Sequence, residues 1–153
     1  MPFTLTTDAF TAGGLIPRIY TADGPNASPA LAWSNPPPGT VTFALVCDDP
    51  DAPVGTWVHW LVWNIPASTA ALPRDVPTTR TLRDGSAQGK NDFGRIGWGG
   101  PSPPRGKPHR YYFRLYALSA SLSLAPGATR HQLDAAMQGL VLGEAELMGK
   151  YGR

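Results

Sequence analysis

The stretch that decides the fold is TFALVCDDPDAPVGTWVHWLVWNI, residues 42–65. It begins with a short apolar run of β-favouring residues, 42–47, which predicts a strand. A second run, 57–65, is apolar on both alternating faces and ends at Pro66, as expected of a central strand that is covered on both sides. The sequence therefore predicts two strands, the second of which buries His59.

A third strand is predicted at Arg110–Leu118, where apolar side chains alternate with polar ones. Near the end of the sequence, Thr129 can cap a helix that has Leu133 and Met137 on one face, and Gly139 offers a place to stop. Residues 140–151 are ambiguous between helix and strand. Short strands with turn signals and one small helix predict a mainly β protein, an antiparallel β-sandwich.

Length and composition restrict the classes of protein. A chain of 153 residues with 42% hydrophobic and 16% charged residues fits one domain, residues 1–153, and excludes disorder. The net charge is only +2 and the basic residues form no run, so nucleic-acid binding is not expected. With one cysteine, no signal-peptide pattern and no apolar window of about 18 residues, we expect a cytoplasmic protein without a membrane span.

Two carboxylates are the first candidates for chemistry. Asp49 and Asp51 straddle Pro50 directly after the first predicted strand, so one can point inward while the other holds the turn. The alternative is that Asp48, Asp49 and Asp51 merely cap a proline-rich turn, which is the commoner role of such residues.

Two histidines and a tyrosine are the next candidates. His59 lies among aromatic residues, where a core histidine bonded to a backbone carbonyl is the alternative to a functional one. His109 and Tyr111 share one face of the third predicted strand. A buried imidazole beside a buried phenol needs hydrogen-bond partners.

The long irregular connection between the last two strands, residues 66–109, is of the kind that is usually functional or disordered. Its segment GWGGPSPPRG, residues 97–106, is rich in glycine and proline. Glycines let the backbone approach a ligand and present N–H groups to an anion, and prolines stiffen the loop. An ordinary tight turn is the alternative.

Together these segments resemble the phosphatidylethanolamine-binding protein family in its bacterial, Raf-kinase-inhibitor-like form. The resemblance is carried by DPDAP (49–53) followed by Trp57 and His59, and by the glycine-proline loop running into His109-Arg110-Tyr111. It implies a large antiparallel sheet packed on a smaller one, with a short C-terminal helix. It also implies a proline-linked cis peptide bond in or beside the 49–53 turn, and a possible homodimer. The ligand-binding residues that it implies are Asp49, Ala52, Pro53, Trp57, His59, Gly99, Gly100, Pro101, His109 and Tyr111.

The function that this resemblance implies is binding of a small anion, such as a phosphoethanolamine-like head group, without a cofactor, a metal or a catalytic residue. The glycine-loop N–H groups, His109 and the Tyr111 hydroxyl would donate to the phosphate, and Asp49 would accept from an amine or a protonated oxygen. A protein kinase or protease is a possible partner, and no stable membrane insertion is expected. The alternative is an enzyme in which Asp49, His59 and His109 form an acid/base set or a metal site.

Overall fold

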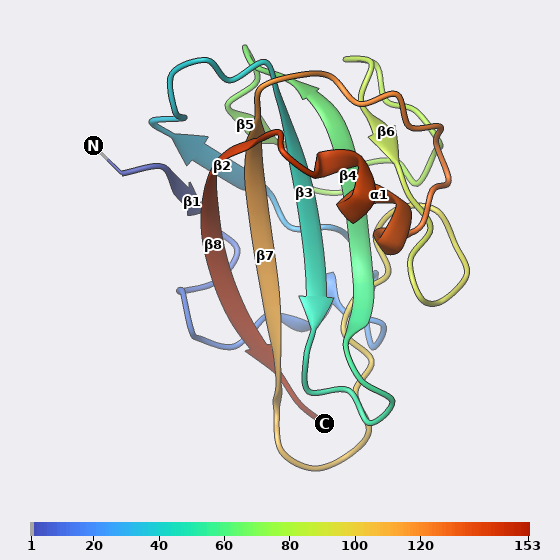
Figure 1. Ribbon diagram of the computed structural model, residues 1–153. Helices are drawn as coiled ribbons and strands as arrows, with labels where there is room; N and C mark the ends of the chain where they lie inside the picture. The colour runs from blue at the N-terminus through green and yellow to red at the C-terminus, as the bar shows by residue number, and fades with distance from the viewer. Residues whose placement is uncertain (1) are drawn as a thin grey trace.

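The computed structural model describes residues 2–153 (Figure 1). Its elements form two antiparallel sheets, one α-helix and one short 3-10 helix, and they follow in the order β1 (Thr4–Thr6), η1 (Arg18–Tyr20), β2 (Leu31–Ser34), β3 (Thr42–Asp49), β4 (Trp57–Pro66), β5 (Ala71–Leu72), β6 (Ala87–Gln88), β7 (His109–Leu118), α1 (Arg130–Met137) and β8 (Val141–Tyr151). The mainly β sandwich of a large and a smaller sheet, with a short helix near the C-terminus, is confirmed.

The large sheet has the strand order β6-β4-β3-β7-β8, and the small sheet has the order β1-β2-β5. The three strands predicted from apolar patterns are the three central strands of the large sheet. β3 extends the predicted run by two residues, to Asp49, and β7 starts one residue earlier, at His109. These extensions matter because they place both residues at the same end of the sheet.

The large sheet is covered on both faces, which explains why its central strands are apolar throughout. Phe43, Leu45 and Cys47 of β3 pack toward the small sheet, and the alternating Ala44 and Val46 pack toward α1. All eight residues of β3 are buried. The predicted burial of His59 in β4 is also confirmed.

The helix α1 begins and ends where the sequence predicts. Thr129 and Gln132 form a reciprocal capping box at its start, and Leu133 and Met137 are its buried residues. Gly139 follows with a φ of +77°, a conformation that glycine adopts without strain.

The ambiguous tail is the strand β8, which pairs with β7 along its whole length. Residues 140–151 suit either a helix or a strand locally, and pairing with β7 selects the strand. Within the part of the chain that the structure describes, no helix is long and apolar enough to cross a membrane.

Candidate functional site

A small cavity lies at the end of the large sheet where β3 ends and β4 and β7 begin. The turn 50–56 and the loop 101–108 meet at this end of the molecule (Figure 1). The cavity has a volume of about 200 Å³. Seven of the ten predicted site residues line it, namely Asp49, Ala52, Pro53, Trp57, His59, His109 and Tyr111.

A β-bulge aims His59 at this cavity. Cys47 pairs with Trp60 and Asp48 pairs with Val58, so His59 is an extra residue of β4 without a partner on β3. A bulge of this kind redirects a side chain and is common beside functional sites. The His59 ring therefore lies on the same side of the sheet as Tyr111, with 5.1 Å between the ring centroids.

The protonation state of His59 follows from its one hydrogen-bond partner. Its Nδ1 lies 2.5 Å from the carbonyl oxygen of Gly99, which can only accept, so Nδ1 carries the proton. Burial lowers the pKa of His59 below its usual value, because it disfavours the charged ring. The neutral ring then has an unprotonated Nε2. The bond to a carbonyl is the one expected of a core histidine, yet the same ring lines the cavity.

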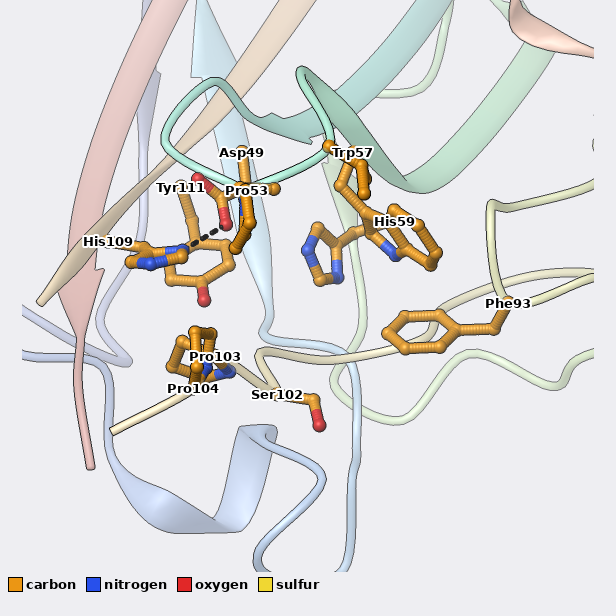
Figure 2. A pocket seen from close by; sticks show the side chains of 12 residues that line it. Asp49, Pro53, Trp57, His59, Phe93, Ser102, Pro103, Pro104, His109 and Tyr111 are labelled. Atoms are coloured by element: carbon orange, nitrogen blue, oxygen red, sulfur yellow. Dashed lines mark hydrogen bonds and ion pairs between the residues drawn. The ribbon is translucent and has the colours of Figure 1, made fainter. Parts of the chain in front are cut away.

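Asp49 points inward and pairs with His109 across the sheet. The distance from Asp49 Oδ2 to His109 Nδ1 is 2.7 Å (Figure 2), and both residues are buried. The other carboxylate oxygen, Oδ1, accepts from the backbone N–H of Asp51 at 2.7 Å. Both oxygens of Asp49 therefore already accept a hydrogen bond from the protein.

Asp51 is the residue that holds the turn. It accepts from the Arg110 side chain through both oxygens, at 2.9 and 2.8 Å, and from the Arg110 backbone N–H. Hydrogen bonds from Arg110 lower the pKa of Asp51 to about 2. One carboxylate thus faces the cavity and one stabilises the turn, as the spacing around Pro50 predicts.

The predicted cis peptide bond at this turn is wrong, because every peptide bond between residues 2 and 153 is trans. No isomerised bond is needed to turn Asp49 inward. The period-two alternation of β3 already sends Asp48 toward α1 and Asp49 toward the cavity, and the two hydrogen bonds of Asp49 hold its carboxylate there.

Two buried donors in the cavity wall lack an acceptor. The Tyr111 hydroxyl and the Trp57 indole N–H are both shielded from solvent, and neither has a hydrogen-bond partner within residues 2–153. Burial, followed by the negative charge of Asp49, raises the pKa of Tyr111 far above its usual value, so the phenol stays protonated and can donate. Figure 2 shows the Tyr111 and His109 rings on one side and the Trp57, His59 and Phe93 rings on the other, with Pro103 and Pro104 below.

The part of the glycine-proline loop at residues 99–101 supports the site without lining the cavity. Gly99, Gly100 and Pro101 do not line the cavity. The N–H of Gly99 donates to the His59 carbonyl at 3.0 Å, and the N–H of Gly100 donates to the Asn26 side chain at 2.8 Å. The expectation that these N–H groups face an anion in the cavity is therefore wrong, because the protein already uses both. A side chain at Gly100 would collide with Asn26 and the backbone of Tyr20, which explains the glycine.

Five lining residues were missed by sequence reasoning, namely Val54, Phe93, Ser102, Pro103 and Pro104. The last three lie in the quoted glycine-proline loop, so proximity to Gly99 was the signal that could have found them. Phe93 lies in the irregular connection, and only its ring contacts with Trp57 and His59, 5.4 and 5.5 Å between centroids, reveal it.

Arg153 stabilises the loop that forms one wall of the cavity. Its guanidinium donates to the Pro103 carbonyl at 3.0 Å and to the Ser102 hydroxyl at 3.2 Å. It also pairs with Asp23 at 2.8 Å. A residue at the far end of the sequence thereby holds the loop that closes the site.

The arrangement of acidic and imidazole groups bears on the metal alternative. Among residues 2–153, no group of three or more His, Cys, Asp and Glu side chains is placed to hold a metal ion together. Asp49 and His109 are bonded to each other, and the Nδ1 of His59 is bonded to Gly99. The geometry thus gives a hydrogen-bonded pair and a separate neutral ring in place of a three-ligand site.

Comparisons with known proteins agree over nearly the whole chain. The profile of the phosphatidylethanolamine-binding protein family matches residues 6–152. A "UPF0098 protein" of Methanothermobacter thermautotrophicus is 51% identical over 149 residues, which cover 97% of this chain and 98% of that protein.

Two solved structures are similar along their full length. A putative phosphatidylethanolamine-binding protein homologue of Chlamydia trachomatis, CT736, matches with a TM-score of 0.90 and 37% identity, covering 99% of this chain and 97% of the other. Escherichia coli YbcL, described as a new member of the mammalian PEBP family, matches with a TM-score of 0.89 and 34% identity, covering 99% and 98%.

Proposed function

Because the chain belongs to the phosphatidylethanolamine-binding protein family, we propose that its cavity binds the phosphate group of a small phosphorylated ligand. The observation that carries the proposal is the pair of unpaired donors, Tyr111 O–H and Trp57 N–H. A buried donor without an acceptor costs about 1–3 kcal/mol, so two of them in one cavity wall call for a ligand that accepts. A phosphate oxygen is such an acceptor.

The polar groups of the cavity favour an anion over a cation. Asp49 is the one acidic residue that lines the cavity, and both its oxygens accept hydrogen bonds from the protein. The two buried groups of the cavity wall that have no partner within residues 2–153, Tyr111 O–H and Trp57 N–H, are both donors and suit an anionic acceptor. The remaining walls are aromatic and proline residues, which exclude water and strengthen each hydrogen bond made inside.

The size of the cavity supports a small head group. Its volume of about 200 Å³ is below the roughly 300–1,000 Å³ of typical drug-sized pockets. A few charge-assisted hydrogen bonds of about 1.5–3 kcal/mol each must offset at least ~4 kcal/mol of binding entropy, so millimolar affinity is expected for inorganic phosphate.

The test is an NMR titration with inorganic phosphate that follows the backbone amides and the histidine rings. We expect saturable shifts at Tyr111, His59 and His109, and an affinity at least about tenfold weaker in Tyr111→Phe, which loses one charge-assisted hydrogen bond. The variant should be as stable as the parent or more stable, because it removes an unpaired buried hydroxyl.

Tyr116→Phe is the matched control. Tyr116 lies on the same strand but packs beside the core on the α1 side of the sheet, away from the cavity. Its variant should bind phosphate as the parent does. Equal affinity in all three proteins, or no shifts at millimolar phosphate, would refute the proposal.

Acid-base catalysis by Asp49, His59 and His109 is the competing hypothesis, and the Asp49–His109 pair is the feature that favours it. Turnover of a phosphomonoester that is lost in His109→Gln would support it. Inhibition of a protein kinase or protease and formation of a homodimer stay predictions from the family resemblance, and our proposal is confined to the ligand.

A further inference from the structure

A second, larger cavity adjoins the first. This basic groove has a volume of about 550 Å³ and shares Pro104 and His109 with the phosphate cavity. Its lining residues are Asp51, Pro104, Arg105, Lys107, Pro108, His109, Arg110 and Lys150. Since Pro104 and His109 line both, the two cavities lie side by side at this ring.

The groove carries unpaired positive charge. Arg110 is neutralised by Asp51, at 2.8 Å. Arg105, Lys107 and Lys150 are exposed, and none of them forms a salt bridge within residues 2–153. The phosphate cavity, in contrast, is lined by no lysine or arginine. The cations that a charged ligand would meet therefore all lie in the groove.

Each cavity is lined by one carboxylate, and each of these carboxylates is already paired within the protein. Asp49 is the acid of the phosphate cavity and Asp51 the acid of the groove, and both oxygens of each accept at least one hydrogen bond from the protein. An ammonium group in the groove would thus meet three unpaired cations, whereas the groove's carboxylate, Asp51, is already paired with Arg110. A second anionic group would meet the same three cations favourably.

The geometry points to a ligand class narrower than phosphate itself: a phosphate ester that bears a second anionic group, a carboxylate or another phosphate, held by Arg105, Lys107 and Lys150. This inference rests on the proposed function of the phosphate cavity. The loop 101–108 contributes to both cavities. Pro103 and Pro104 line the phosphate cavity, and Arg105 and Lys107 line the groove. Lys150 reaches the groove from β8, where it pairs with Arg110 in the sheet.

The test compares three phosphate esters that differ in the group beyond the phosphate. Glycerol 3-phosphate ends in a neutral hydroxyl, 3-phosphoglycerate ends in a carboxylate at the same position, and O-phosphoethanolamine ends in an ammonium. Affinities are measured by NMR titration at low salt and at high salt. We expect 3-phosphoglycerate to bind at least about fivefold tighter than glycerol 3-phosphate, and O-phosphoethanolamine to bind weaker than both. Exposed charges are screened, so the preference should shrink in high salt.

The groove variant, Arg105→Gln/Lys107→Gln/Lys150→Gln, tests whether these three cations cause the preference for 3-phosphoglycerate. Its expected ratio of affinities for the two glycerol-type esters is within about twofold of one, because only the charged contacts are removed. The matched control is Arg74→Gln/Arg83→Gln/Lys90→Gln, which removes the same charge from exposed residues that line neither cavity. The control should keep the full preference.

The outcomes separate this inference from the proposed function. Binding of glycerol 3-phosphate without a preference for 3-phosphoglycerate would overturn the inference and leave the phosphate cavity standing. A preference that survives in the groove variant, or tighter binding of O-phosphoethanolamine than of glycerol 3-phosphate, would also overturn it. Failure of all three esters to bind would refute the proposed function itself.

Discussion

Asp48 and Asp49 are neighbours on β3, yet they belong to two very different regions. Asp48 faces α1 and accepts from Arg114 at 2.6 Å and from Arg130 at 2.9 Å, which joins β3, β7 and the helix. Asp49 faces the opposite side, pairs with His109 and lines the cavity for which we propose phosphate binding. Both carboxylates are almost fully buried.

The two regions differ in whether their buried polar groups have hydrogen-bond partners in the chain. On the helix side the buried carboxylate is matched by two guanidinium groups of the same chain, which is how a buried charge is stabilised in a structural role. On the cavity side the Tyr111 and Trp57 donors have no acceptor within residues 2–153. The proposed ligand site rests on these two unsatisfied donors of the cavity wall.

The largest expected effect is that of Asp48→Asn. It leaves Arg114 and Arg130 without their shared counter-ion, and since each arginine is about a quarter exposed (22% and 26%), we expect a loss of about 2–3 kcal/mol in the free energy of unfolding. Urea denaturation measures it. Phosphate affinity of the folded variant should not change.

Asp49→Asn is the control for that prediction. The amide oxygen replaces one of the two acceptor oxygens, so one hydrogen bond, from His109 or from the Asp51 N–H, is lost, and the stability loss should be about 1 kcal/mol. An equal loss in the two variants would mean that the Asp49 pair is as structural as the Asp48 network, and the contrast between the two regions would fail.

The next effect is the pH dependence contributed by His59. Its pKa is lowered in the folded state, mainly by burial, so the unfolded chain takes up more protons below its own pKa of about 6.5. This stability is fully present above that pH and is lost as the pH falls toward the folded pKa. We expect a loss of at most about 1 kcal/mol between pH 7 and pH 5.5, measured by urea denaturation.

Two variants isolate this contribution. His59→Gln should flatten the pH profile over this range, and the exposed His131→Gln should leave it as in the parent. A profile in His59→Gln as steep as that of the parent would assign the pH dependence to other groups.

The smallest effect concerns the contacts of Arg153 with the loop that lines the cavity. Asp23 accepts hydrogen bonds from Arg153 and Tyr151, which lower the pKa of Asp23 to about 2. Asp23→Asn removes the carboxylate that orients Arg153 toward Ser102 and Pro103, so phosphate affinity should fall by up to about threefold. Stability should change little, because the side chains of the pair are partly exposed, 34% for Arg153 and 25% for Asp23. Asp134→Asn breaks a comparable exposed pair with Arg130, far from the cavity, and should not affect affinity. Equal affinities in the two variants would show that the Arg153 contact does not position the loop.

Much of the fold could be predicted because its signals are local. The apolar runs of β3 and β4, the alternation of β7 and the Thr129 cap each depend on neighbouring residues. The β8 strand could not, since residues 140–151 suit both helix and strand until β7 provides a pairing partner. The bulge at His59 also escaped prediction, because it depends on the register between two strands.

For the site, the sequence by itself, through its family resemblance, indicated seven of the twelve side chains that line the cavity, and these lie beside the predicted ends of β3, β4 and β7. Only the tertiary structure decided how each is used. It supplied protein acceptors for the N–H groups of Gly99 and Gly100 and left the Tyr111 and Trp57 donors without an acceptor within residues 2–153. It also brought Lys150 beside Arg105 and Lys107. The physical reason is that strand periodicity is encoded residue by residue, whereas hydrogen-bond satisfaction and charge clustering depend on contacts between segments far apart in the chain.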